Sequence, residues 1–206
     1  MDKKNIKNIV FDFGDIFINL DKPATLLRMK KLGLKELSPE LVKMNESYEK
    51  GLISTSHFVQ YYHHLFPQVE KEELVQAWNA IILDFPEYRL NFLEKLANKK
   101  NFRLFLLSNT NELHISAVKN SMSDTKYERF KSYFEKFYLS HEIHLRKPDL
   151  EIFNFVIQEN GLNPQQTLFV DDTLENVLAA KEAGWKGWHL IPGEEDIINL
   201  LDKNFF

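Results

Sequence analysis

Cysteine is absent from the 206-residue sequence, and glycine and proline are scarce, with 7 of each. The absence of cysteine excludes a disulfide framework, thiolate metal sites, iron–sulfur clusters and a cysteine nucleophile, and it favours a reducing, cytoplasmic location. Because few turn-forming residues are present, most of the chain is expected in regular elements, with helices dominating, and a sheet-only fold with many tight turns is disfavoured.

Long apolar runs and a surplus of basic charge are also missing. No stretch reaches about 18 uncharged apolar residues, the length that a membrane-spanning helix needs, and the N-terminus has no secretory hydrophobic region. The formal net charge of −4 argues against nucleic acid as the main partner. With 44% hydrophobic residues, the sequence predicts a soluble globular protein without a membrane or nucleic-acid partner, whose self-sufficient core is compatible with a monomer.

Five short, almost wholly apolar segments are typical of buried strands: residues 8–13, 103–108, 136–140, 167–171 and 187–191. Such runs are what a parallel sheet covered on both faces requires. Apolar residues recur with helical spacing at 149–160 and 174–184. The buried face predicted for the second of these helices comprises Leu174, Val177, Leu178 and Ala180. Alternating strands and helices predict an α/β fold, with a Rossmann-like parallel sheet and helices on both faces.

The segment between the first two predicted strands, from about Leu20 to about Phe102, is far longer than a crossover needs. Apolar spacing and prolines predict helices near residues 23–32, 39–50, 55–66, 70–83 and 87–99, the last of which can be the crossover itself. The others would form a helical insert above the sheet edge. We therefore expect a core of residues 1–19 and 95–206, with a small all-helical cap of residues 20–94 inserted after the first strand.

Polar residues gather where the predicted strands end, which is where open α/β sheets bind their ligands. They are Asp12 and Asp15, Ser108 and Asn109, Asp171 and Asp172, with Arg146 and Lys147 shortly after the third strand. Clustered carboxylates would repel one another, so their assembly predicts a divalent cation, and oxygen-only ligands favour Mg²⁺. A lysine and a serine beside them suit a phosphate that bridges the metal and the lysine. The combination predicts phosphoryl transfer.

Four short motifs occur in order, each beside its predicted strand: an apolar run ending at Asp12, one ending at Ser108 and Asn109, the pair Lys147 and Pro148, and a run ending at Asp171 and Asp172. In this order they resemble the haloacid dehalogenase superfamily, and the long insert is similar to that family's helical cap. The segments FDFGDIFINLD, YEKGLIS, LLSNTNELH, YLSHEIHLRKPD and FVDDTLENV further resemble bacterial phosphatases that act on sugar 1-phosphates such as α-D-glucose 1-phosphate.

The resemblance implies a Mg²⁺-dependent phosphatase that hydrolyses a small phosphorylated metabolite through an aspartyl-phosphate. Asp12 would be the nucleophile. Mg²⁺ would be held by Asp12, the backbone carbonyl of Gly14 and Asp172, with Asp171 in support nearby, and would offset the repulsion between the attacking carboxylate and the phosphate.

Substrate binding is implied at positions beside the nucleophile and in the cap. Ser108, the backbone N–H of Asn109 and Lys147 would hold the transferred oxygens, and Lys147 should stay protonated among so many acids. Glu49, in the segment Tyr48–Gly51, would lie in the cap near the mouth of the active site. Two histidines near the predicted rim are further candidates for substrate contact: His114 and His141.

One position departs from the family pattern. Most phosphatases of the superfamily have a second Asp two residues after the nucleophile, which serves as general acid and base, and this chain has Gly14 there. General acid–base catalysis contributes roughly 10²- to 10⁴-fold. Either Asp15 substitutes, or a cap residue does, or the leaving group departs with little help. We favour the last, because an anomeric sugar hydroxyl is more acidic than an ordinary alcohol. Asn176, where many relatives have a further Asp, predicts weaker metal binding.

Two other functions stay open. A metal-free 2-haloacid dehalogenase also uses an Asp nucleophile and also lacks an Asp two residues further on, but no cation would then offset Asp171 and Asp172. The alternative outside catalysis is a binding or regulatory protein that keeps the pocket without turnover, which Gly14 suggests. Metal-dependent phosphate release, chloride release or neither would separate the three.

Overall fold

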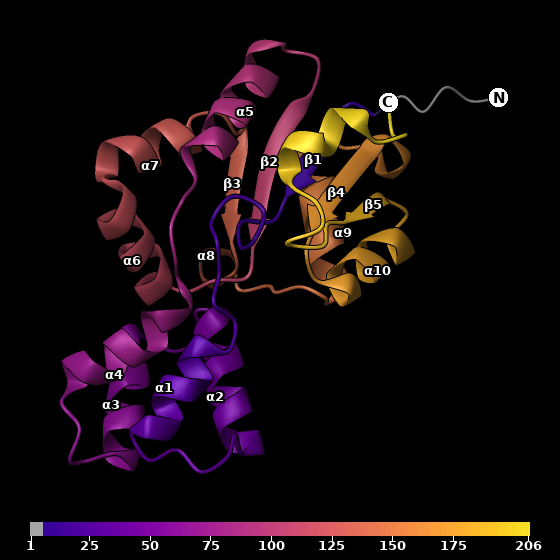
Figure 1. The fold of residues 1–206 in the computed structure, drawn as a ribbon. Helices are drawn as coiled ribbons and strands as arrows, with labels where there is room; N and C mark the ends of the chain where they lie inside the picture. The colour runs from indigo at the N-terminus through magenta and orange to yellow at the C-terminus, as the bar shows by residue number, and fades with distance from the viewer. Residues whose placement is uncertain (1–5) are drawn as a thin grey trace.

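The computed structural model describes residues 6–206; residues 1–5, at the start of the predicted core, lie outside the described part. Five parallel strands form one sheet in the core (Figure 1). The sheet order is β3-β2-β1-β4-β5, with strands at Asn8–Phe11 (β1), Arg103–Ser108 (β2), Lys136–Leu139 (β3), Thr167–Asp171 (β4) and Lys186–His189 (β5). The predicted parallel sheet is confirmed.

Side chains of the central strands alternate between two hydrophobic clusters, one on each face of the sheet. One cluster contains Phe11, Leu106 and Val170, and the other contains Val10 and Phe105. Each fully buried side chain of this size contributes about 1.5–3 kcal/mol of transfer free energy. Burial on both faces explains why the strand segments are apolar throughout.

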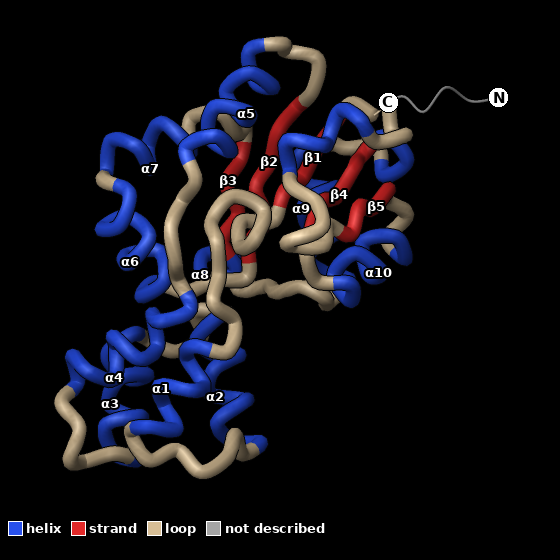
Figure 2. Tube along the Cα trace, viewed as in Figure 1, coloured by secondary structure: helices blue, strands red, loops and turns tan. Residues whose placement is uncertain are grey.

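Helices of the core cover both faces, as Figure 2 shows in blue around the red strands. They are α5 (Glu87–Asn98), α6 (Glu112–Met122), α7 (Asp124–Lys131), α8 (Ser140–Ile143), α9 (Leu150–Asn160) and α10 (Leu174–Glu182), with short 3₁₀ turns at Pro164–Gln166 and Ile197–Asp202. Residues of α5, α6 and α7 belong to the first cluster, and residues of α9 and α10 to the second. Within the described residues, no helix is long and apolar enough to cross a membrane.

The orientation of α10 differs from the prediction. Leu174 and Leu178 are 47% and 53% exposed, although apolar spacing placed them on the buried face. Val177 and Ala180 are buried as predicted, and the inward side also carries Asn176. Asn176 donates to the carboxylate of the buried residue Asp171, so a polar contact sets the rotation of this helix and turns the two leucines outward.

The cap consists of α1 (Ala24–Lys31), α2 (Pro39–Glu49), α3 (Thr55–Leu65) and α4 (Lys71–Trp78), followed by a 3₁₀ turn at Asn79–Ile81. It lies beyond the carboxyl ends of the strands, below the sheet in Figure 1. Ser38 and Ser54 cap α2 and α3 by accepting hydrogen bonds from the backbone N–H groups of Leu41 and His57. A separate aromatic cluster, which includes Phe58 and Tyr62, holds the helices together.

Two antiparallel segments connect the cap to the core. The backbone N–H of Asn19 donates to the carbonyl of Asp84 at 2.9 Å, and that of Leu83 donates to the carbonyl of Asn19 at 3.0 Å. The boundary predicted at residue 94 falls inside α5, yet Leu90 and Leu93 of this helix pack in the cluster on the sheet. We propose that the whole of α5 belongs to the core.

Candidate active site

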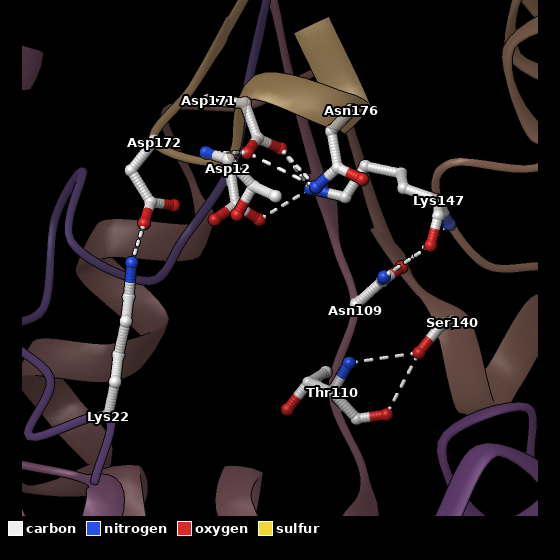
Figure 3. A network of polar contacts seen from close by, with 10 residues as sticks. Asp12, Lys22, Asn109, Thr110, Ser140, Lys147, Asp171, Asp172 and Asn176 are labelled. Atoms are coloured by element: carbon white, nitrogen blue, oxygen red, sulfur yellow. Dashed lines mark hydrogen bonds and ion pairs between the residues drawn. The ribbon is translucent and has the colours of Figure 1, made fainter. Parts of the chain in front are cut away.

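Three buried charged groups meet where β1 and β4 end. Asp12 directly follows β1, Asp171 is the last residue of β4, and Lys147 lies in the loop before α9. Lys147 Nζ is 2.7 Å from Asp12 Oδ1 and 2.7 Å from Asp171 Oδ2 (Figure 3). From β1 the chain continues to β2 and β3 on one side of the sheet, whereas β4 and β5 lie on the other side. The strand order therefore reverses between β1 and β4, and such switch points are where these sheets bind ligands.

Asp171 is fully occupied by hydrogen-bond donors. Its Oδ1 accepts from the backbone N–H of Thr173 at 2.8 Å, and Asn176 Nδ2 lies 3.2 and 3.1 Å from Oδ1 and Oδ2. With Lys147 as a further donor, these contacts hold the carboxylate in one orientation. Asp171 thus fixes the ammonium group of Lys147 beside Asp12.

The clustered carboxylates leave a surplus of negative charge that a cation could neutralise. Carboxylate oxygens of Asp12, Asp171 and Asp172 lie within 4.8 Å of one another. Burial raises the pKa of Asp12 to about 7; Lys147 opposes this shift, while Asp171 and Asp172 add to it. Burial opposes the charge on Lys147, but Asp12 and Asp171 outweigh it and raise the pKa of Lys147, which therefore stays protonated as predicted. An oxygen-only donor set with surplus negative charge fits Mg²⁺.

Lys22, in the segment that enters the cap, is a residue that the sequence reasoning missed. Its ammonium group forms a short ion pair with Asp172 Oδ2 and lies 3.3 Å from Asp15 Oδ2. Asp15 Oδ1 in turn accepts from the backbone N–H of Leu20 at 3.0 Å, which ties the loop after β1 together. No local pattern marks Lys22, because it reaches the site from the cap side of the chain.

The loop that carries Lys147 is aligned by Asn109. Asn109 Nδ2 donates to the carbonyl of Lys147 and Asn109 Oδ1 accepts from its backbone N–H, both at 2.8 Å. Ser140 Oγ accepts from the backbone N–H of Thr110 at 2.9 Å, so β2 and β3 are held together beside this loop (Figure 3). Ser108, the last residue of β2, is 3% exposed.

A cavity of about 420 Å³ opens on this cluster. Its lining includes the predicted site residues Asp12, Gly14, Asn109, Lys147 and Asp172, together with Leu20, Lys22, Arg146, Pro148, Thr173, Glu175 and Asn176. The predicted residues Asp15, Ser108, Asp171 and Glu49 lie around the cavity rather than on its described lining. The role of each stays a prediction.

Gly14 is where the family's general acid would stand, and Leu20 fills the adjacent space. A Cβ on Gly14 would lie 2.6 Å from Leu20 Cδ1 and 3.8 Å from Asp12 Oδ2. The side of the cavity nearest the nucleophile is therefore apolar at the point where a carboxyl group would otherwise lie.

The cap closes against the core at the C-terminal end of α2. Arg146 Nη2 is 3.1 Å from Glu49 Oε2, and Ser140 Oγ donates to the backbone carbonyl of Glu49 at 2.6 Å. Gly51 follows with φ 63°, and a Cβ there would lie 2.0 Å from the carbonyl oxygen of His141. Glu49 thus lies at the cap–core contact, and its predicted role in substrate binding stays a prediction.

Tyr48 of the cap and the two histidines predicted near the rim of the site do not line the cavity that contains Asp12. Tyr48 is buried in the cap cluster, stacked on Phe58 with 4.1 Å between ring centroids. The expectation for His114 is wrong, since its ring stacks on Trp78, bonds to the Trp78 carbonyl and does not line the cavity with Asp12. His141 lines a different cavity, beside Gly51 and Tyr48.

Comparison with known proteins agrees with this geometry. The family model of haloacid dehalogenase-like hydrolases matches residues 2–184. The chain belongs to this family. It is a hydrolase with the family's core, and the resemblance inferred from the four motifs is confirmed.

Relatives from two bacteria cover almost the whole chain. A D-ribitol-5-phosphate phosphatase of Bacteroides thetaiotaomicron is 32% identical over 88% of this chain and 90% of its own length. A HAD family enzyme of the same organism, solved as a magnesium complex, has a TM-score of 0.85 at 33% identity, covering 97% of this chain and all of that one. A predicted HAD-like hydrolase of Porphyromonas gingivalis has a TM-score of 0.79 at 27% identity, covering 96% and 97% of the two chains.

Proposed function

We propose that this chain is a Mg²⁺-dependent phosphatase that hydrolyses the phosphomonoester of a small sugar or polyol through an aspartyl-phosphate on Asp12. The observation that carries the proposal is the position of Asp12, held 2.7 Å from Lys147 and beside Asp172 on the cavity at the sheet's switch point. Support also comes from the Bacteroides thetaiotaomicron HAD family enzyme, which was solved with magnesium and inorganic phosphate.

Asp12 performs both covalent steps. One of its carboxylate oxygens forms a bond to phosphorus while the ester bond to the leaving oxygen breaks, and that oxygen takes up a proton from solvent or from Asp15 as it departs. A water molecule then attacks phosphorus and gives up one proton, which replaces the proton taken up by the leaving oxygen. The bond to Asp12 breaks, and inorganic phosphate leaves with the carboxylate restored. Lys147, Ser108 and the backbone N–H of Asn109 hold the phosphoryl oxygens in line during both steps.

The metal is assigned to the acidic end of the cavity. Asp12, Asp172 and the backbone carbonyl of Gly14 would hold Mg²⁺, and Asp171 supports the site by holding Lys147 in place. When bound, the ion supplies the positive charge that offsets repulsion between the Asp12 carboxylate and the phosphate dianion.

Two substrate classes have separate support. The absence of an acid at Gly14 favours a leaving group that departs with little help, such as the anomeric oxygen of α-D-glucose 1-phosphate. The Bacteroides relative named for D-ribitol 5-phosphate supports an alditol phosphate, whose primary alcohol is a poorer leaving group. In that case Asp15, bonded to the Leu20 backbone and near Lys22, is a carboxyl candidate for proton transfer.

A phosphate-release assay with α-D-glucose 1-phosphate, D-ribitol 5-phosphate and other phosphosugars tests the proposal. We expect release with Mg²⁺, none with EDTA, and a loss of roughly 10³-fold or more for Asp12→Asn. Metal-independent chloride release from 2-chloropropionate would support the dehalogenase alternative, and no turnover of any compound would support a binding protein. Equal rate losses for Asp12→Asn and Asp15→Asn would make Asp15 the general acid.

A further inference from the structure

Three cations line the catalytic cavity, and each is already paired with an acid. Lys147 contacts Asp12, and Lys22 contacts Asp172. Arg146 directly precedes Lys147 in the sequence, yet its guanidinium group contacts the cap rather than the catalytic carboxylates. It therefore stands apart from the machinery of the proposed reaction.

Arg146 is neutralised by two acids of one cap helix. Its Nη1 is 3.2 Å from Glu46 Oε1 and its Nη2 is 3.1 Å from Glu49 Oε2. The side chains of Arg146 and Glu49 are 23% and 26% exposed, so this contact is partly shielded from solvent. The end of α2 is held in place by the bond from Ser140 to the Glu49 carbonyl and by the ion pair of Lys50 with Asp149.

The charges available to a substrate follow from these pairs. A phosphate dianion and Mg²⁺ carry equal and opposite charges, so their joint binding leaves the balance of the cavity unchanged. The rest of the lining, which would face the remainder of the substrate, includes Leu20, Pro148, the paired Arg146 and the acidic residue Glu175. Among the described residues that line the cavity, every cation already has a carboxylate partner. None is therefore free to bind a second anionic group of the substrate.

We propose that Glu46 and Glu49 are specificity-determining residues, which neutralise Arg146 and thereby restrict the enzyme to phosphomonoesters whose leaving group is uncharged. This inference rests on the proposed phosphatase function. Removing the two acids would leave the guanidinium charge at the cavity wall, where it can attract a carboxylate on the leaving group. Specificity would then arise because Glu46 and Glu49 neutralise Arg146, and not because the enzyme makes an additional contact with the preferred substrate.

The test compares D-ribitol 5-phosphate, which has a neutral leaving group, with 2-phosphoglycolate, whose leaving group carries a carboxylate. In the parent enzyme with Mg²⁺ we expect the higher kcat/KM for the neutral ester. The double variant Glu46→Gln, Glu49→Gln should raise the ratio of kcat/KM for 2-phosphoglycolate to kcat/KM for D-ribitol 5-phosphate by roughly tenfold. The change should come from a lower KM for 2-phosphoglycolate. The gain should shrink at high salt, because dissolved ions screen the attraction between the guanidinium group and the substrate carboxylate.

Two variants separate charge masking from cap docking. Lys50→Gln weakens a cap–core ion pair without touching Arg146, so it should change both substrates by the same factor. Adding Arg146→Gln to the double variant should abolish its gain. An unchanged ratio in the double variant, or an equal shift in Lys50→Gln, would overturn the inference while metal-dependent turnover still upheld the phosphatase. Absence of phosphate release from every ester would instead refute the proposed function itself.

Discussion

The ammonium group of Lys147 and the carboxylate of Asp171 form an ion pair 2.7 Å long, with side chains 1% and 0% exposed. The same ammonium group also pairs with Asp12, so one buried cation is shared by two buried carboxylates. Removing one partner of such a group leaves uncompensated charge in the interior, which costs far more than the loss of a surface pair.

Lys147→Gln should therefore lower the free energy of unfolding by about 3–5 kcal/mol in EDTA. Mg²⁺ should restore part of the loss, because a divalent cation can balance Asp12 and Asp172 in place of the ammonium group. Urea unfolding followed by circular dichroism, with EDTA and with Mg²⁺, measures both quantities. Lys50→Gln, which breaks the more exposed pair with Asp149, serves as the control and should cost at most about 1 kcal/mol. A Lys147 variant as stable as the parent in EDTA would contradict this account.

Removing the charge of Lys22 should strengthen Mg²⁺ binding. The Lys22 ammonium group contacts Asp172 and lies 3.3 Å from Asp15, so it competes electrostatically with a metal ion at the same carboxylates. Because the Lys22 side chain is 53% exposed, solvent screening limits the effect, and we expect a gain of roughly threefold to tenfold in affinity for Lys22→Met. Titration calorimetry with MgCl₂ measures it, with the exposed Lys35→Met as control. Equal or weaker Mg²⁺ binding by Lys22→Met would refute the competition.

The sequence predicted the sheet and the centre of the site for the same physical reason. A strand buried on both faces must be apolar, so a polar residue at its end is conspicuous, and Asp12, Ser108 and Asp171 were found in that way. Lys147 was found shortly after the third predicted strand and again in the Lys-Pro motif of the family resemblance, and the structure places it between Asp12 and Asp171.

Contacts between distant elements escaped sequence reasoning. Glu46 and Lys22 are charged residues of the cap region with no local signature, and only the docking of cap on core brings them to Arg146 and Asp172. On α10, Leu174 and Leu178 were wrongly placed on the buried face because apolar spacing takes no account of the bond from Asn176 to Asp171. Tertiary polar contacts of this kind override the local pattern.

Gly51 should tolerate no side chain, whereas Gly161 should tolerate a methyl group at modest cost. The two have nearly equal left-handed φ angles of 63° and 59°, but a Cβ on Gly51 would lie 2.0 Å from the His141 carbonyl oxygen, while one on Gly161 meets nothing within 4 Å. Gly161→Ala should cost about 1 kcal/mol from backbone conformation alone. Gly51→Ala should cost clearly more and raise KM, because the end of α2 that carries Glu49 must move. Thermal unfolding and steady-state kinetics of Gly51→Ala and Gly161→Ala distinguish local backbone strain from displacement of the cap. Equal losses of stability and equal KM values in the two variants would rule out the contact of Gly51 with His141 as the cause.

His114 should make the stability of the protein depend on pH in the acidic range. Burial lowers the pKa of His114 from its ordinary value of 6.5 to about 4, against a smaller opposing effect of its bond to the Trp78 carbonyl. The unfolded chain therefore binds this proton more readily than the folded one. The contribution of neutral His114 to stability is complete above pH 6.5 and falls as the pH drops towards 4. The loss across this interval is about 3 kcal/mol at most.

The slope of stability against pH isolates this group from the carboxylates that titrate nearby. His114→Gln cannot take up the proton, so its unfolding free energy should fall less steeply than that of the parent between pH 6.5 and 4, even if the variant is less stable at pH 7. His57→Gln, at an exposed position of α3, should leave the slope of the parent unchanged. Identical slopes for His114→Gln and the parent would contradict this prediction. They would mean that His114 takes up its proton while the contact between α4 and α6 stays intact. If burial opposes protonation, the protonated imidazole must instead separate from Trp78.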